Sequence, residues 1–184
     1  MAQVEDTTSA SASRVRVWDL GVRLFHWSLV TMVVLTYVFD EPRKLHRGMG
    51  YVVLGLIAFR LIWGFIGTRH ARFTDFIPSP RRLTGYLRDM LRGREERFLG
   101  HNPAGAAMIV VLLCTLAAVG ATGYMMGMGA YFGKDWVENT HKLLVNILFL
   151  FVACHIGGVV FSSRRHRENL VKSMITGQKD TNDH

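Results

Sequence analysis

Four long apolar segments constrain this chain more than any other feature of its sequence. They lie near residues 20–39, 46–66, 103–126 and 140–161. A helix needs about 20 predominantly apolar residues to cross the hydrocarbon core of a bilayer, and each segment approaches that length. A soluble bundle is the alternative, but its helices would need a polar face, and the segment MIVVLLCTLAAVGATGYMM has none. The sequence therefore predicts an all-α fold, a four-helix transmembrane bundle.

The basic residues are distributed unevenly around these segments. Of the 22 Lys and Arg residues, 16 lie at or before the start of the first segment, in the connection 67–102, or after residue 161. Only four lie near the other two connections. Because cytoplasmic loops carry an excess of Lys and Arg, we expect both termini and the long central connection in the cytoplasm. The net charge of +8 accompanies no DNA- or RNA-binding motif, so nucleic acid is not an expected partner.

The polar parts of the chain predict short cytoplasmic elements around a single membrane domain. Residues 1–14 and 180–184 are expected to be disordered tails, which leaves one domain over residues 15–179. In the connection 67–102, Leu83, Leu87 and Leu91 recur at helical spacing opposite Arg81 and Arg88. This pattern predicts an amphipathic helix that either lies on the anionic inner leaflet or packs, solvated, on the end of the bundle.

Four histidines lie within or at the ends of the apolar segments: His26, His46, His141 and His155. The last two are 14 residues apart, which places them on one helical face with an axial separation of about 21 Å. With the expected orientation, His26 and His155 fall toward the cytoplasmic side, and His46 and His141 toward the opposite side. A lone histidine in a membrane helix is often a packing residue. Two pairs matched in depth instead predict ligation of a metal or a haem iron.

Two arginines near the cytoplasmic pair suggest how charge is balanced there. Arg60 lies within an apolar segment, where a guanidinium costs roughly 2.5–3.5 kcal/mol. No Asp or Glu lies in the apolar body of any segment, so a haem propionate is the predicted partner of Arg60. Arg23, close to one turn before His26, is a second candidate. Snorkelling of Arg60 to the lipid headgroups is the alternative. Because a CxxCH motif is absent, the haem would be held noncovalently, as haem b.

Several motifs together resemble one known family. They are VWDLGVRLFHW at 17–27, LHRGMGY at 45–51, FRLIWGFIGTRHARF at 59–73, GHNPAG at 100–105 and HKLLVNILFLFVACHIGG at 141–158. In this combination the chain resembles the bacterial cytochrome b561 family and the related di-haem cytochrome b subunits of nickel-iron hydrogenases. The resemblance implies an inner-membrane protein with two b haems, ligated by the pairs His26/His155 and His46/His141. It also implies electron exchange with a quinone pool or a redox protein.

Two histidines on each iron would leave no open coordination position, which limits the expected chemistry. The predicted function is electron transfer across the inner membrane between a quinone, ubiquinone or menaquinone, and a redox partner. A cytochrome c, a dehydrogenase subunit or a hydrogenase subunit would fit that partner. Membrane lipid is a further expected partner. The sequence leaves open a homodimer and an oxidoreductase activity of the chain's own.

Two other functions compete with this prediction. One is a haem-bearing membrane anchor in a hydrogenase-like or cytochrome c-linked complex. The other is a metal-ion transporter that uses the intramembrane histidines, although its path would be expected to carry carboxylates, which these segments lack. The remaining histidines His70, His101 and His166 are expected to be surface residues, with a proton relay as the alternative.

Overall fold

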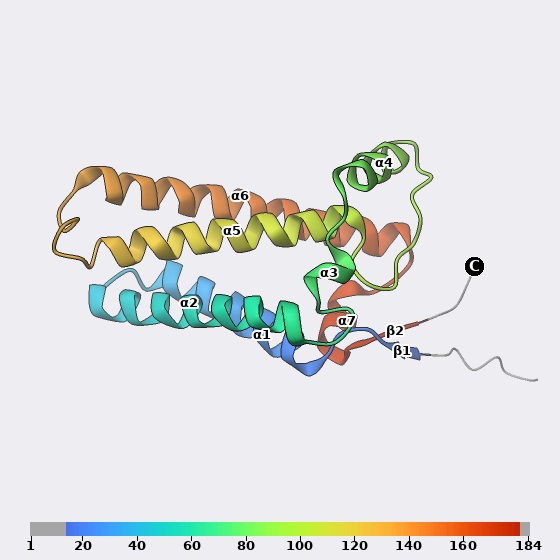
Figure 1. Ribbon diagram of the computed structural model, residues 1–184, viewed down its shortest axis with the longest axis horizontal. Helices are drawn as coiled ribbons and strands as arrows, with labels where there is room; N and C mark the ends of the chain where they lie inside the picture. The colour runs from blue at the N-terminus through green and yellow to red at the C-terminus, as the bar shows by residue number, and fades with distance from the viewer. Residues whose placement is uncertain (1–13, 181–184) are drawn as a thin grey trace, which may run out of the picture.

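Four long helices dominate the computed structural model, which describes residues 14–180 (Figure 1). They are α1 (Leu20–Val38), α2 (Arg43–Ile66), α5 (Pro103–Met125) and α6 (Asp135–Arg165). All four are long and apolar enough to cross a membrane, which confirms the prediction of four candidate spans. With 31 residues, α6 is about 46 Å long and extends past the predicted segment at both ends. Hydropathy marks only the apolar part of a helix, whereas the backbone hydrogen bonds continue through its polar ends.

Local sequence signals explain where the helices begin. Asp19 is the N-cap of α1, and its carboxylate accepts a hydrogen bond from the Val22 backbone N–H at 2.8 Å. Asn102 caps α5 in the same way, accepting from Gly105 at 2.7 Å, and Pro103 follows at the first helical position. Such side chains satisfy backbone donors that the first helical turn leaves unpaired.

The helices pack in a series, α1 on α2, α2 on α5 and α5 on α6. A layer of apolar side chains from all four helices fills the middle of the bundle. Outside this layer most of the apolar surface is exposed, for example at Phe65 (69%) and Ile66 (71%). Such a surface is stable only in an apolar medium, as expected for helices within a bilayer. The layer consists of Val53, Ile57, Leu116 and Leu148, with Leu29, Met32, Val33, Leu112 and Val152 packed against it.

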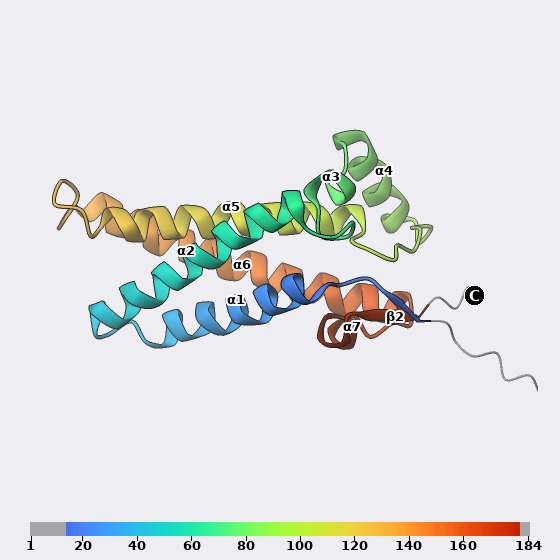
Figure 2. The same cartoon turned by 60° about the horizontal axis from the view of Figure 1, so that its bottom comes forward.

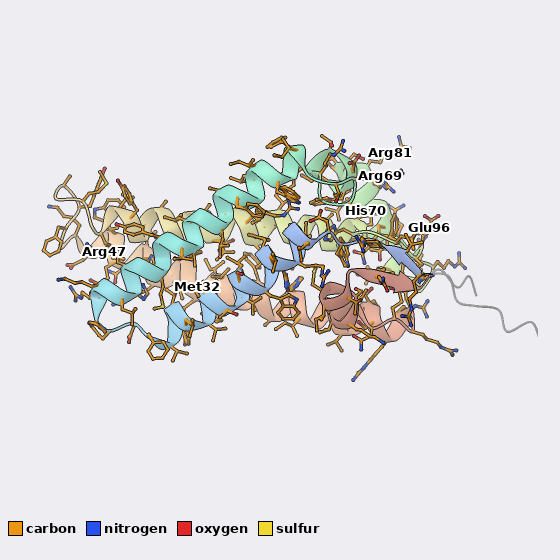
Figure 3. The ribbon with its side chains drawn as sticks, turned by 90° about the horizontal axis from the view of Figure 1, so that it is seen from below. Met32, Arg47, Arg69, His70, Arg81 and Glu96 are labelled. Carbon is orange, nitrogen blue, oxygen red and sulfur yellow. The ribbon has the colours of Figure 1, made fainter. Side chains whose placement is uncertain are left out.

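The two ends of the bundle differ. At one end, here called the capped end, lie α3 (Phe73–Phe76), α4 (Pro80–Leu91), α7 (Leu170–Thr176) and two short strands (Figures 1 and 2). The opposite end, here called the open end, carries only the connections 39–42 and 126–134. Figure 3 shows Arg69, His70 and Arg81 at the capped end and Arg47 at the open end. The helix predicted in the central connection is α4, which packs against α5.

A small antiparallel sheet closes the capped end, and the all-α prediction missed it. Strand β1 (Arg14–Arg16) pairs with β2 (Gln178–Asp180), with Val15 opposite Lys179. Three-residue strands show no hydrophobic alternation, so only their long-range pairing reveals them. Arg14, predicted in the N-terminal tail, is the first residue of β1. Asp180, predicted in the C-terminal tail, is the last residue of β2. The rest of the two predicted tails, residues 1–13 and 181–184, lies outside the described residues.

Candidate functional site

The histidines occupy a regular pattern on α2 and α6. On α6, His141, Leu148 and His155 are spaced seven residues apart, and on α2, His46, Val53 and Arg60 share the same spacing. Seven residues are close to two helical turns, so each set shares one face. Leu148 and Val53 belong to the central apolar layer. The layer therefore separates a histidine pair at the open end from a second pair, with Arg60, toward the capped end.

His46 and His141 face each other at the open end. Their ring centroids are 6.4 Å apart and the ring planes are inclined by 73°. Nδ1 of His46 lies 3.0 Å from the Thr36 carbonyl oxygen, and Nδ1 of His141 lies 3.1 Å from the Val119 carbonyl oxygen. A carbonyl only accepts, so each Nδ1 carries the proton and donates it. Each Nε2 is then left with its lone pair, the arrangement in which histidine ligates a metal.

The spacing of this pair fits a bis-histidine iron site. With metal–nitrogen bonds of about 2 Å, two imidazole centres on opposite sides of one metal lie about 6 Å apart. Beside the pair, Gly50 is half-buried, yet a Cβ there would meet no atom within 4 Å, which leaves room next to the ligands. A Cβ at Gly123 would come within 3.3 Å of Cε1 of His141. Gly123 and Thr122, whose hydroxyl lies 3.0 Å from Nδ1 of His141, position this imidazole. Neither was predicted, because each contact crosses between helices.

His26 and His155 form the second pair, on α1 and α6. Both are half-buried, and their imidazoles are close enough to interact electrostatically. In contrast to the open-end pair, Nδ1 of His26 is buried and has no hydrogen-bond partner. Its ring meets Trp27 edge-on at 5.0 Å. A buried imidazole nitrogen without a partner is costly, so Nδ1 of His26 needs an acceptor that the described residues do not supply.

The two predicted arginines lie, like this second pair, toward the capped end, and among the described residues each keeps one buried nitrogen without a partner. Arg60 is only 3% exposed, so it does not snorkel out of the bundle. Its Nη2 donates to the Ala71 carbonyl at 3.1 Å, and its Cζ lies 4.7 Å from the centroid of the Phe73 ring. Arg23 donates from Nη2 to the carbonyl of Ile175 and so holds α7 on α1. The unpartnered atoms are Nη1 of Arg60 and Nε of Arg23.

The expectation of a plain surface histidine is wrong for His101. Its ring lies between Trp18, at 4.5 Å between centroids, and Phe76, at 4.8 Å. Burial, followed by the positive charges of Arg60 and Lys179, lowers the pKa of His101 to about 3. The side chain is therefore neutral at neutral pH. It also borders a cavity of about 170 Å³ that is lined by His70 and Phe98 as well.

The described residues contain no group of three or more His, Cys, Asp or Glu side chains placed to hold a metal ion. The histidines come together only as pairs. A bare transition metal ion or Ca²⁺ normally takes three or more ligands from a protein site, whereas a haem iron needs only two axial ones. The donor set fits haem better than a transported ion.

Comparison with known proteins identifies the family of the chain. The family model described as prokaryotic cytochrome b561 matches residues 17–177. A probable Ni/Fe-hydrogenase B-type cytochrome subunit of Rhizobium leguminosarum bv. viciae is 24% identical, covering 90% of this chain and 88% of the relative. The protein described in the same words from Bradyrhizobium diazoefficiens is 25% identical, covering 92% and 87%. No solved structure matches the chain. The chain therefore belongs to the prokaryotic cytochrome b561 family and is a haem b-bearing, multi-pass electron-transfer protein of the bacterial inner membrane.

Proposed function

We propose that the protein carries two haem b groups, one ligated by His46 and His141 and the other by His26 and His155. The observation that carries this proposal is the 6.4 Å spacing of the His46 and His141 rings, with both Nδ1 atoms within hydrogen-bonding distance of backbone carbonyls. The second site is supported by the position of His155, which lies 14 residues after His141 on the same face of α6. A haem with two axial histidines supplies one-electron redox chemistry without an open position for oxygen or substrate.

The two proposed haem sites lie at different depths in the membrane. The ligands His141 and His155 are 14 residues apart on α6, an axial rise of about 21 Å. The central apolar layer lies between the two ligand sets, and its side chains offer no polar group to water or an ion. The chain thus holds two redox centres at different depths and keeps the intervening space dry. Electron transfer from one face of the membrane to the other follows as its function.

The orientation proposed from the charges places the capped end in the cytoplasm. Of the 22 Lys and Arg residues, 16 lie in the segments that form this end. Two of these 16 residues, Arg81 and Arg88, are exposed on α4 beside the bundle. Excess basic charge is retained on the cytoplasmic side during insertion, so the pair His46/His141 would face the periplasmic side.

For partners, we propose a redox protein on one side and a quinone, ubiquinone or menaquinone, on the other. The similar proteins from Rhizobium and Bradyrhizobium are described as probable subunits of Ni/Fe-hydrogenases, which supports a hydrogenase-like partner complex. In such a complex the chain would be both the membrane anchor and the electron conductor. A metal-ion transporter is less well supported, since no metal-binding group of three or more ligands occurs in the described part of the chain.

A haem count tests the proposal directly. The experiment is a dithionite-reduced minus oxidised absorption spectrum of the purified protein, with a pyridine haemochrome assay per chain. We expect two low-spin b haems per chain, partly reduced by a quinol. One haem would refute ligation by one of the two pairs. No haem, in protein produced with ample haem supply, would overturn the proposal and lead next to metal-binding measurements.

A further inference from the structure

His101 lies near a second unsatisfied donor at the capped end. Nδ1 of His101 and Nη1 of Arg60 are both closed off from solvent, and within residues 14–180 neither has a hydrogen-bond partner. The charge of Arg60 acts on the His101 ring, and so does that of His155, one of the proposed ligands. Phe76 contacts both side chains, with its ring 4.8 Å from the His101 ring and 5.8 Å from Cζ of Arg60. Two unsatisfied polar groups thus lie in one region beside the proposed haem site.

Neither side chain is free to turn away and find a partner elsewhere. The His101 ring is held between Trp18 and Phe76, and the next residue, Asn102, is fixed as the N-cap of α5. Arg60 is anchored by its bond to the Ala71 carbonyl and by its position over Phe73. A buried polar atom without a partner destabilises the fold, and two of them in one region indicate a ligand that satisfies both.

The charges nearby indicate that this ligand is an anion. Two of the carboxylates at this end already have partners: Asp19 accepts hydrogen bonds from Trp63 and Thr68, and Glu168 is paired with Lys179 at 3.2 Å. A third, Asp75, borders the cavity but is exposed. The positive charge of Lys179 also acts on His101. A buried guanidinium with an unpaired N–H favours a carboxylate or phosphate oxygen over a neutral acceptor.

We propose that His101 and Arg60 together bind one carboxylate of the haem held by His26 and His155. This inference rests on the proposed function and assigns His101 a positioning role for that haem. A neutral imidazole has one N–H to donate, and Arg60 supplies a second, charged donor. Both would reduce the negative charge felt by the iron, which favours the ferrous state. Removing either donor should therefore lower the potential of this haem and leave the other haem unchanged.

The variant His101→Phe removes the donor but keeps an aromatic ring between Trp18 and Phe76. His166→Phe is the matched control, because His166 lies at the same end as the C-cap of α6. Redox titration of the holoprotein should show one midpoint potential shifted down in His101→Phe and neither shifted in His166→Phe. The reduced-minus-oxidised infrared spectrum should show a carboxylate band that moves only in His101→Phe. His101→Gln, which restores an N–H donor, should recover part of both effects.

A double-variant cycle with Arg60→Leu tests whether the two donors share one carboxylate. Shared binding predicts that the combined shift of the midpoint is smaller than the sum of the single shifts. The inference is overturned if His101→Phe retains two haems with unchanged midpoints and infrared bands, or if His101→Gln and His101→Phe shift them equally. Either result leaves the proposed function intact, whereas a wild-type protein without two haems would refute the function itself. If His101→Phe does not fold, His101→Gln is compared with the wild type by redox titration and infrared spectroscopy, and this comparison decides whether the inference stands.

Discussion

The two proposed ligand pairs consist of the same residue type in different surroundings. At the open end, backbone carbonyls of Thr36 and Val119 orient the imidazoles of His46 and His141. At the capped end, Nδ1 of His26 has no partner, and the nearby Arg60 also keeps an unpaired nitrogen. Helix packing alone therefore prepares the first site. At the second site, the unpaired donors and the positive charge of Arg60 favour binding of an anionic group. The properties of this site should therefore depend more on the bound group and on the protein segments that cover it.

Among the described residues, additional secondary structure covers the bundle at the capped end but not at the open end. Here we call β1, β2 and α7 the terminal clasp. Its strands join the two ends of the described chain, and Lys179 of β2 pairs with Glu168, which also pairs with Arg97. A further ion pair of 2.9 Å joins Arg165 at the end of α6 to Glu95 in the α4–α5 connection. The open end has no comparable structure among the described residues. The comparison predicts that variants at one end leave the other end unaffected.

The largest expected effect is the loss of one haem. His141→Ala and His155→Ala each remove one axial ligand and should each lower the haem content from two per chain to one. Because the central apolar layer separates the pairs, the remaining haem should keep its midpoint potential. Pyridine haemochrome assays and redox titration measure both quantities. Loss of both haems in either variant would contradict the independence of the two ends.

A smaller effect is expected from Arg60→Leu. Removal of this buried cation should lower the midpoint of the haem at the capped end by roughly 50 mV, close to a tenfold change in the one-electron equilibrium. Arg60→Lys keeps the charge and should give a smaller shift, although it loses the planar contact with Phe73. The midpoint of the open-end haem serves as the internal control. Equal shifts of both haems, or an unchanged titration, would rule out a local role for Arg60.

The smallest expected effect is acid opening of the terminal clasp. Burial alone would raise the pKa of Glu168, but the hydrogen bond from Arg97 and the charge of Lys179 lower it below its ordinary value of 4.5. A carboxylate with a depressed pKa stabilises the folded state above its unfolded pKa, and this stabilisation is lost as the pH falls through the folded pKa. Amide hydrogen exchange in β1 and β2, corrected for the intrinsic rate, should therefore rise below about pH 4.5.

Glu168→Gln provides the matching test at neutral pH. The variant leaves Lys179 and Arg97 without their carboxylate, so exchange in the clasp should rise about tenfold, equivalent to about 1.4 kcal/mol. The exposed pair Lys142 and Glu138 at the open end is the control, and Glu138→Gln should change little. Clasp exchange that is independent of both pH and Glu168 would show that β1 and β2 are held by backbone pairing alone.

The sequence by itself determined the number of spans, the family and the depth of each histidine. These features depend on apolar segment length and on a fixed rise per residue, so His141 and His155 lie 14 residues, or about 21 Å, apart along α6 whatever surrounds them. The same reasoning marked Arg60 as a buried charge, and it is 3% exposed. Local periodicity and spacing are sufficient for such predictions.

Only the tertiary structure decided what surrounds those residues. The carbonyls within reach of Nδ1 of His46 and His141 belong to other helices, and the two strands pair residues at opposite ends of the described chain. His101 is flanked by Trp18 and Phe76, which come from different elements, so no local pattern distinguished it from a surface histidine. Hydrogen bonding and desolvation depend on atoms that are distant in sequence, and these appear only when the helices and the clasp are packed together.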